Sequence, residues 1–543
     1  MRTFLFNIIK MKKLKLVGLA IAMACATPSF AGGLLTNTNQ HVAFNRMMSR
    51  EASIGIDGVY YNPAGVVFMG EGHHLAINWQ LAYQTRSIEN DYALFTNNVN
   101  NPITPRTFKG EAFAPVVPSF QYAYNKGRWS LQASFALTGG GGKCTFDNGL
   151  GSFEKIVAET AIAACGLART VDNVLGNTLG QPGMKMFTTD QAFGQKGEYS
   201  YNSYMHGRQY YYGLSVGAAY KFSDNFSASA GVRGVYASTN YYGYVENIKV
   251  GNMPLYKVLD PTKENAANIE LSCDQSGVGF TPIIGVDYKT GRWNFSAKYE
   301  FKTRIRLKNK SVNQAPSIGN LPANLSNQMT GILTAKYQQA GLTLEQAKQQ
   351  AENKTNTVLT DPTVGATMLG LKTQFDAKLK EAIGEYEDGK KIAGDIPAYL
   401  ALGVGYSPAD AVRVNVGFHW FDDKNATSYN NRQEKLKRGT LEYNAGVEVD
   451  VNKKITLSTG WQNTNYGLSD EYMDDKSFVV SSNSVAVGGV YHINKKMDLN
   501  VAYFHTFYQH KKTSENVELI GKTYSSDYTR NNNVFAVGLD INF

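Results

Sequence analysis

The chain has 543 residues, of which 43% are hydrophobic and 18% charged, and glycine (52) and tyrosine (33) are frequent. Its mean hydropathy of -0.31 excludes a helical membrane protein. A soluble chain of this length usually divides into several domains, but no linker divides this one. The composition is typical of a membrane β-barrel, in which half of each strand faces lipid and half faces water.

The first segment predicts export. Three lysines precede the apolar run Leu16 to Ala26, and Ser29-Phe30-Ala31 then offers a cleavage site. Together these features are typical of a secretory signal peptide over residues 1–31. The segment carries five basic residues and no acidic ones, so the formal charge of +9 falls to +4 after cleavage. The basic balance is therefore no reason to expect a nucleic-acid partner.

Residues 32–72 lie between this segment and the first predicted strand. They are too few for a separate domain, and side chains alone cannot fill the lumen of a wide barrel. We therefore expect them to fold inside the barrel as a hatch. The segment ends near the turn Tyr60 to Gly65 (YYNPAG), in which Pro63 lacks an N–H and Gly65 tolerates positive φ.

Long strands of strict alternation follow. From Arg292 to Lys308 the odd positions are uncharged and mostly apolar, and the even positions are polar and mostly charged. A charge that faces lipid near the midplane would cost roughly 2–4 kcal/mol, and the odd positions carry none. The same pattern predicts fourteen strands, which start near residues 73, 114, 128, 209, 226, 277, 292, 396, 411, 440, 454, 483, 497 and 533.

Short turns and long loops alternate between these strands. The short turns are expected at 125–127, 223–225, 290–291, 408–410, 452–453 and 494–496, and the long loops near 88–112, 139–205, 242–275, 309–395, 424–438, 467–481 and 510–531. This alternation is typical of outer-membrane barrels. The predicted fold class is therefore all-β: a fourteen-stranded antiparallel transmembrane β-barrel over residues 73–543. We expect a monomer in the outer membrane of a Gram-negative bacterium, in contact with lipid and lipopolysaccharide.

The two largest loops, 139–205 and 309–395, contain apolar residues at helical spacing, and Thr343 to Gln346 resembles a capping box. We therefore expect helical extracellular loops. The chain ends in an alternating strand whose apolar face finishes at Phe543, which looks like the signal that the barrel-assembly machinery reads. The alternative is a soluble all-β protein, against which the strand lengths, the signal peptide and this ending argue.

Chemical motifs are sparse. No HExxH, GxSxG or P-loop spacing occurs, so we expect neither an enzyme nor a cofactor. A metal site is not supported, because no CxxC occurs. The mature chain would keep Cys144, Cys165 and Cys273. The first two could form a disulfide in an exported protein, which would leave one thiol over, but the sequence alone leaves the pairing open.

Three parts of the chain resemble a known family. The stretch Phe44 to Met69 (FNRMMSREASIGIDGVYYNPAGVVFM) is similar to the hatch of the FadL-type long-chain fatty-acid and hydrophobic-compound transporters of Gram-negative outer membranes. It departs from the family pattern at Asn45 and Arg50, where glycine is usual. The stretches 276–307 and 396–420 are similar to strand pairs of the family. The resemblance implies a fourteen-stranded barrel, in agreement with the count above.

The resemblance also implies a function, namely passive uptake of hydrophobic compounds, above all long-chain fatty acids, through a hatch-gated barrel. The hatch and gate residues that it implies are Arg46, Glu51, Asn62, Pro63, Ala64 and Gly65. Gly33, Leu34 and Leu35 would reach into the ligand pocket. The apolar faces of the loop helices would form a funnel that first captures the ligand, although such faces could equally pack against each other.

Alternation adds a second candidate site. Lys298, Lys302, Arg304, Arg306 and Lys308 share one face of the seventh strand. We expect this face to line the lumen, where the cations would attract a carboxylate head group. They could instead pair with lumenal acids or with lipopolysaccharide phosphates. The run Gly139 to Gly142 is expected to end the third strand, which family members bend to open a sideways exit into the membrane.

Three other functions compete with transport of hydrophobic compounds. A general diffusion porin would need an open polar lumen, against which a hatch of about forty residues argues. A surface adhesin would keep the long loops but would need no apolar pocket. An outer-membrane hydrolase would need a Ser/His or Asp/His cluster, which the sequence does not suggest.

Overall fold

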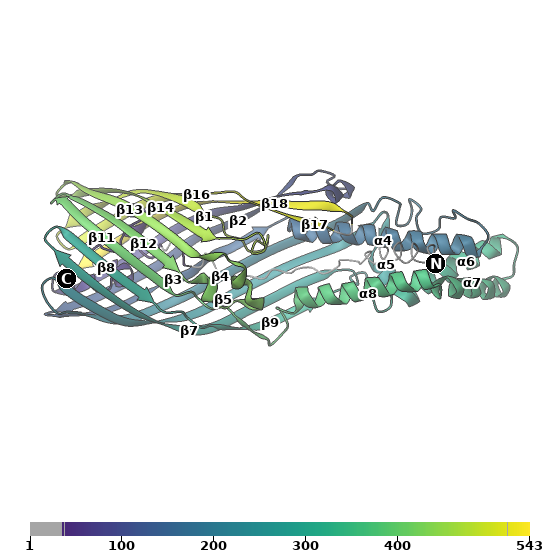
Figure 1. Ribbon diagram of the computed structural model, residues 1–543, viewed down its shortest axis with the longest axis horizontal. Helices are drawn as coiled ribbons and strands as arrows, with labels where there is room; N and C mark the ends of the chain where they lie inside the picture. The colour runs from purple at the N-terminus through teal and green to yellow at the C-terminus, as the bar shows by residue number, and fades with distance from the viewer. Residues whose placement is uncertain (1–34, 37–38, 518–519) are drawn as a thin grey trace, which may run out of the picture.

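The computed structural model describes Leu35, Thr36, residues 39–517 and residues 520–543. The strands form one antiparallel sheet that closes on itself, because the first wall strand pairs with both the second and the last. The predicted all-β barrel of fourteen strands is confirmed (Figure 1). The expected signal peptide, residues 1–31, lies outside the described residues.

The described wall contains strands of two kinds. Eleven are continuous: β1 (Gly72–Tyr92), β2 (Arg106–Lys126), β3 (Trp129–Phe146), β4 (Tyr199–Lys221), β5 (Phe226–Val250), β7 (Ile269–Thr290), β12 (Val412–Phe421), β13 (Arg438–Asn452), β14 (Ile455–Gly467), β15 (Ser482–Asn494) and β18 (Lys522–Asn542). Three are interrupted: β8 (Trp293–Glu300) with β9 (Arg306–Gln314), β10 (Lys391–Ala393) with β11 (Tyr399–Ala409), and β16 (Met497–Tyr508) with β17 (Lys511–Val517). The short β6 (Met253–Pro254) pairs with the end of β5.

The helices lie in two places. Before β1 the chain forms α2 (Val42–Met47), α3 (Gly58–Tyr61) and the 3-10 helix η1 (Gly65–Phe68). The loops carry η2 (Ala93–Asn97), α4 (Gly151–Thr178), α5 (Tyr256–Leu259), α6 (Leu321–Gln339), α7 (Leu344–Leu359), α8 (Pro362–Ile383), η3 (Asp423–Asn425) and η4 (Tyr429–Lys435). Figure 1 shows α4 to α8 beyond one end of the barrel and the C-terminus at the other end. None of the helices within the described residues is both long and apolar enough to span a membrane.

The outer face of the wall carries an apolar belt. Exposed members of this belt include Trp79, Phe120, Leu214, Phe280, Phe295, Val416, Leu457, Val487 and Phe535. The inner face is polar, and its buried residues include Asn78, Gln80, Gln121, Ser134, Asn444, Gln462 and Asn500. Apolar residues outside and polar residues inside are the arrangement of an outer-membrane barrel.

The strands start as predicted at the end with short turns and extend further than predicted at the other end. Strand β5 begins at Phe226 and β16 at Met497, as expected. Strands β4, β7 and β18, however, begin at Tyr199, Ile269 and Lys522, so the expected loop 510–531 is wrong and is a β-hairpin instead. Outward residues beyond the belt are polar, so apolar alternation stops there while backbone pairing continues.

The predicted single strand from Arg292 to Lys308 contains a β-bulge. Ile283 of β7 is opposite Glu300, whereas Ser276 is opposite Lys308, so seven steps along β7 match eight along β8 and β9. One extra residue reverses the direction of every later side chain. As a result Ile305 and Leu307 are buried instead of facing lipid.

The long loops are helical, as expected. The stripe predicted in the loop 139–205 lies on α4, whose Phe153, Val157 and Leu175 are buried. Thr343 and Gln346 form the predicted capping box at the start of α7. Helices α4 and α6 to α8 share one apolar cluster with inward residues of β1, β5 and β7, so the helical loops form a cap over the barrel mouth.

Helix α2 lies against the wall because glycines allow a close approach. A Cβ added at Gly460 of β14 would lie 1.7 Å from the carbonyl oxygen of Met47, and one added at Gly446 of β13 would lie 2.1 Å from the same atom. Any side chain at these positions would displace the helix.

We therefore predict that Gly460→Ala pushes α2 away from the wall. Overpacking of this kind typically costs about 1–3 kcal/mol. The expected result is faster amide hydrogen exchange in residues 42–68 and larger ion conductance in planar bilayers. The matched control is Gly234→Ala, because an added Cβ there would meet no atom closer than 3.7 Å, in ordinary contact with the Phe280 ring and the Leu214 carbonyl oxygen. Equal exchange in the two variants would contradict the prediction.

Candidate functional site

Residues 39–71, called the lumenal segment here, lie inside the barrel. His41 caps the start of α2, because its side chain accepts a hydrogen bond from the N–H of Ala43, and Met48, just after the helix, lies in the left-handed region (φ 62°). Phe44 and Met48 pack with Ala486, Phe504 and Val534 on the inner wall. Helix α2 therefore packs on the adjacent strands β15, β16 and β18, inside the barrel.

Two arginines of the segment surround one wall carboxylate. Arg46 forms an ion pair with Glu448 of β13, and its Nε donates to Asn500 Oδ1 at 3.2 Å. Arg50 donates to both carboxylate oxygens of Asp57, at 2.7 and 3.0 Å, and its Nη1 lies 3.5 Å from Glu448. All these charged groups are buried. Paired buried charges hold a geometry firmly, because removing one partner leaves an uncompensated charge.

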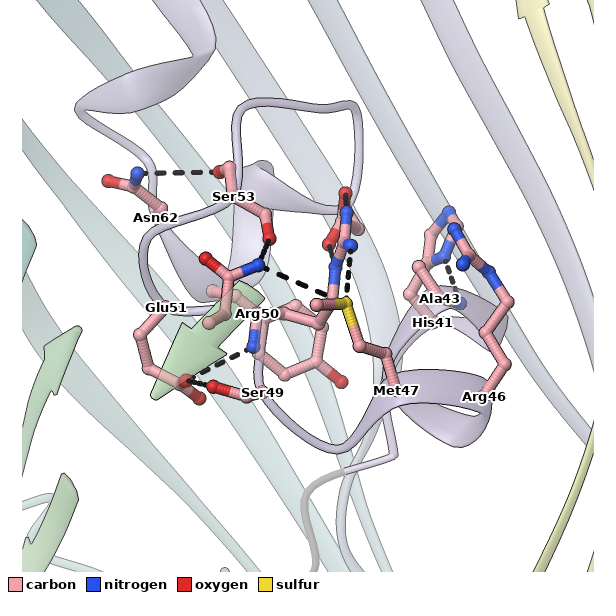
Figure 2. A network of polar contacts seen from close by, with 12 residues as sticks. His41, Ala43, Arg46, Met47, Ser49, Arg50, Glu51, Ser53 and Asn62 are labelled. Carbon is pink, nitrogen blue, oxygen red and sulfur yellow. Dashed lines mark hydrogen bonds and ion pairs between the residues drawn. The ribbon is translucent and has the colours of Figure 1, made fainter. Parts of the chain in front are cut away.

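A histidine bridge fixes the middle of the segment. Glu51 Oε1 lies 2.7 Å from Nε2 of His419 on β12, and Nδ1 of the same ring lies 2.9 Å from Glu442 Oε2 on β13. Both neighbours are carboxylates, so a protonated ring donates from both nitrogens. The other oxygen of Glu51 accepts from the N–H of Arg50 at 3.0 Å (Figure 2). Glu51 thus connects the segment to two adjacent strands.

The Asn62 to Gly65 turn is bound to three strands. Asn62 Nδ2 donates to Asp287 of β7 at 2.6 Å, and Asn62 Oδ1 accepts from the N–H of Gly65 at 3.1 Å. The carbonyl of Pro63 accepts from Gln132 of β3, and that of Ala64 accepts from Ser227 of β5, each at 2.7 Å. Gly65 is required here, since an added Cβ would lie 2.4 Å from Asn62 Nδ2.

Tyr60, just before this turn, is held by a buried group of charges. Lys298 Nζ donates to the Tyr60 carbonyl at 2.7 Å and to Glu300 at 2.9 Å, and it lies 4.4 Å from the centroid of the Tyr60 ring. Arg233 of β5 donates to both oxygens of Glu300, at 2.6 and 3.0 Å. Cation–π contact and charge pairing together fix this ring.

The wall itself is interrupted beside the lumenal segment. The ladder between β2 and β3 stops after Ala112–Cys144 and resumes at Ser119–Ala136. Gly140 (φ 84°) and Gly142 (φ 113°) lie opposite this interruption. The expectation that the glycine run ends the third strand is therefore wrong, because β3 continues to Phe146. The glycines bend β3 in its middle, in conformations that other residues rarely adopt.

Gln40 lies behind this interruption and joins its two sides. Its carbonyl oxygen accepts from Ser119 Oγ and from Gln121 Nε2, both at 2.7 Å. Its side-chain Nε2 donates to the Leu137 carbonyl at 2.7 Å. The start of the lumenal segment therefore closes the inner side of the interrupted ladder.

Of the predicted basic ladder, Lys298 is buried in the lumen as expected, but Arg304, Arg306 and Lys308 are not. The bulge directs Arg304 and Arg306 outward, where both are exposed, and Lys302 donates to the carbonyl of Asn425.

Of the predicted pocket residues, Gly33 and Leu34 lie outside the described residues. Leu35 is buried with Tyr211, Val235, Ile305 and Tyr399. The one predicted pocket residue that the structure describes therefore lies in the lumen.

Two lumenal arginines were missed by sequence reasoning. Arg86 of β1 and Arg530 of β18 are directly opposite each other. They share the inward face with Ile88 and Tyr528, which are buried. Both donate to Gln84 Oε1, at 3.2 and 2.7 Å, and within the described chain neither forms an ion pair with a carboxylate. Both arginines occupy even positions of alternating strands, and this pattern could have placed each of them on the inward face. The sequence alone does not show that the first and last strands pair, which is what brings the two arginines together.

The helical cap contains an apolar pocket. It is lined only by apolar side chains, which come from α4, α5, α6, α8 and the segments beside them and include Leu167, Val171, Phe187, Leu255, Leu325 and Leu371. An apolar lining of this kind favours an apolar ligand through the hydrophobic effect.

One buried carboxyl group lies in the cap. Glu385, between α8 and β10, is 1% exposed, and neither carboxylate oxygen has a hydrogen-bond partner. Burial raises the pKa of Glu385 to about 8, although Lys476 and Arg432 act in the opposite direction. The group is therefore mostly protonated at neutral pH.

Thiol and metal chemistry has little support. Cys144, Cys165 and Cys273 are buried free thiols, so the disulfide considered between the first two is not formed. The part of the chain that the structure describes contains no group of three His, Cys, Asp or Glu side chains placed to bind a metal.

Comparisons with known proteins agree with this architecture. The fold matches that of a FadL homologue from Pseudomonas aeruginosa, with a TM-score of 0.55 and 14% identity over 94% of this chain and 100% of that chain. A toluene transporter, TbuX of Ralstonia pickettii, matches with a TM-score of 0.46 and 13% identity over 94% and 99% of the two chains. A scan of family models and a search of curated proteins returned no match. The expected FadL-type fold is thus confirmed.

The arginine pairs give a prediction for the lumenal segment. Arg50→Met should leave Asp57 buried and unpaired, which typically costs about 3–5 kcal/mol. We expect faster hydrogen exchange across residues 42–68, measured by mass spectrometry, while exchange in the wall strands stays slow. Adding Asp57→Asn to Arg50→Met should restore much of the protection, because both charges are then gone. A double variant as labile as the single one would contradict the pairing argument.

Glu385 gives a prediction about pH. A pKa raised from the ordinary value of 4.5 to about 8 means that the folded cap binds a proton more tightly than the unfolded chain does. The contribution of this group is therefore greatest at low pH and is lost as pH rises towards 8. Limited proteolysis of the cap should be faster at pH 8.5 than at pH 6. Glu385→Gln should reduce this difference, and an unchanged pH dependence would contradict the assignment.

Proposed function

We propose that this protein moves hydrophobic compounds inward across the outer membrane, with the lumenal segment as its gate. The observation that carries the proposal is the interrupted ladder between β2 and β3, closed from inside by Gln40. Phe113 and Val116 of the interrupted stretch are exposed on the outer face. An opening there would lead from the lumen into the lipid.

The first step of this route is capture in the cap. The pocket between α4, α5, α6 and α8 would remove an apolar molecule from water. The barrel mouth lies directly below the cap, since the two share one apolar cluster. The ligand would then pass into the lumen above the lumenal segment.

The last step is sideways release. An apolar molecule gains nothing from entering periplasmic water, so exit into the bilayer is favoured. Release would require Gln40 to leave Ser119 and Leu137. Because Arg46, Glu51 and Asn62 are held by the wall, we expect a small shift rather than departure of the whole segment.

We further propose that the carried compounds include long-chain fatty acids. The support is the pair Arg86 and Arg530, two facing cations that no described carboxylate neutralises. Like charges directly opposite each other are unfavourable, and a carboxylate head group between them would remove the repulsion. We still propose that Leu35, with Gly33 and Leu34, forms part of the pocket for the acyl tail. The hydroxyl oxygen of the neighbouring Thr36 lies 2.6 Å from Tyr466 Oη.

The test is competition with a fluorescent long-chain fatty acid on purified, folded protein. We expect saturable binding that an unlabelled fatty acid displaces. Replacing both cations (Arg86→Gln/Arg530→Gln) should weaken binding of the acid by about tenfold or more, since charge-assisted hydrogen bonds contribute about 1.5–3 kcal/mol. Binding of the alcohol of the same chain length should stay unchanged.

The matched control replaces two exposed loop lysines (Lys263→Gln/Lys348→Gln) and removes the same net charge. Unchanged acid binding in the arginine variant would reject the head-group assignment but leave transport of hydrophobic compounds in place. If the native protein binds no apolar competitor saturably, the proposal fails and a porin or adhesin on the same scaffold becomes the better description.

A further inference from the structure

Four cations form a basic strip on the outside of the barrel. The strip consists of Arg304 just before β9, Arg306 and Lys308 at the start of β9, and Lys391 on β10, and all four are exposed. Their direction follows from the bulge between β8 and β9, which turns Ile305 and Leu307 inward and the alternate residues outward.

The basic strip lies at the outer edge of the apolar belt. Added Cβ atoms at Gly277 and Gly279 of β7 would lie 2.7 and 2.9 Å from the carbonyl oxygens of Arg306 and Arg304. The outward neighbours on β7 are therefore Val278 and Phe280, which are 65% and 70% exposed. Towards the start of β7 the outward residues become polar, as at Asp274 and Ser276. The cations thus stand where lipid tails give way to head groups.

Acidic side chains neutralise only part of this charge. Lys308 and Lys391 are directly opposite each other. Arg306 lies 2.8 Å from Asp395, which Lys302 also approaches at 4.0 Å. Within the described residues Arg304, Lys308 and Lys391 form no ion pair. Facing like charges are unfavourable unless an anion lies between them.

We propose that the basic strip binds the phosphate groups of an outer-leaflet glycolipid of the lipid A type, with its acyl chains against Val278 and Phe280. Such an amphiphile satisfies both features of the site, because its phosphates meet the cations and its chains meet the belt. Arginine and lysine are the usual protein partners of phosphate. An acidic soluble protein would match the charge but would leave the adjoining apolar surface unexplained. This site is separate from the proposed transport route.

The experiment measures lipid retained by the purified barrel in detergent, by native mass spectrometry. The probes are lipid A with two phosphates and the same lipid after both phosphates are removed. The test variant is Arg304→Gln/Lys308→Gln/Lys391→Gln. The control variant is Lys453→Gln/Lys495→Gln/Lys496→Gln, which removes the same charge from exposed turns at the other end of the barrel. Folding of each variant is checked by heat-modifiable gel mobility.

We expect the native barrel and the control variant to bind phosphorylated lipid A equally. The test variant should bind it at least about tenfold more weakly, because it lacks three cations that would attract the anionic head group. Equal binding by the test variant would overturn the proposal. Equal binding of the phosphate-free lipid by the native barrel would also overturn it, because acyl contacts alone would then explain the association.

Discussion

The charge pairs between the lumenal segment and the inner wall are the interaction on which the rest of the structure depends. A closed barrel of this size presents a polar inner face, and side chains alone do not fill it. Arg46 and Arg50 meet at Glu448, and His419 bridges Glu51 to Glu442. Since a buried charge that loses its partner is strongly destabilising, segment and wall fix each other's positions.

Close backbone contact between the lumenal segment and the wall also supports these pairs. Gly446 and Gly460 let α2 reach the wall, and Gly65 lets the turn fold over Asn62. The two residues at which the segment departs from the family pattern, Asn45 and Arg50, both have partners here. Asn45 donates to Gln80 at 2.8 Å and Arg50 pairs with Asp57. The departures therefore add contacts to the hatch and do not disrupt it.

Much of the barrel was predictable from the sequence, because lipid imposes alternation on each strand and short turns mark one end. Beyond the belt this signal stops, so β4 and β18 extend further than alternation indicated. A pattern of period two could not show that one extra residue is present near Phe301. Because of this residue, Arg304 and Arg306 lie on the outer surface and not in the lumen as expected. The pair Arg86 and Arg530 depends on closure of the sheet, which joins residues from the two ends of the chain.

The interrupted ladder is one local irregularity that would connect the proposed gate with the proposed exit. Backbone groups that face lipid need partners, so a break between β2 and β3 is tolerated only if something satisfies them. Gln40 satisfies one such group from inside, the Leu137 carbonyl, while Ser119 and Gln121 hold its own carbonyl. The residue that seals the wall therefore belongs to the same segment that Arg46, Arg50 and Glu51 anchor. A ligand that shifts this segment would unseal the wall by the same movement, so opening would need no separate hinge in the barrel.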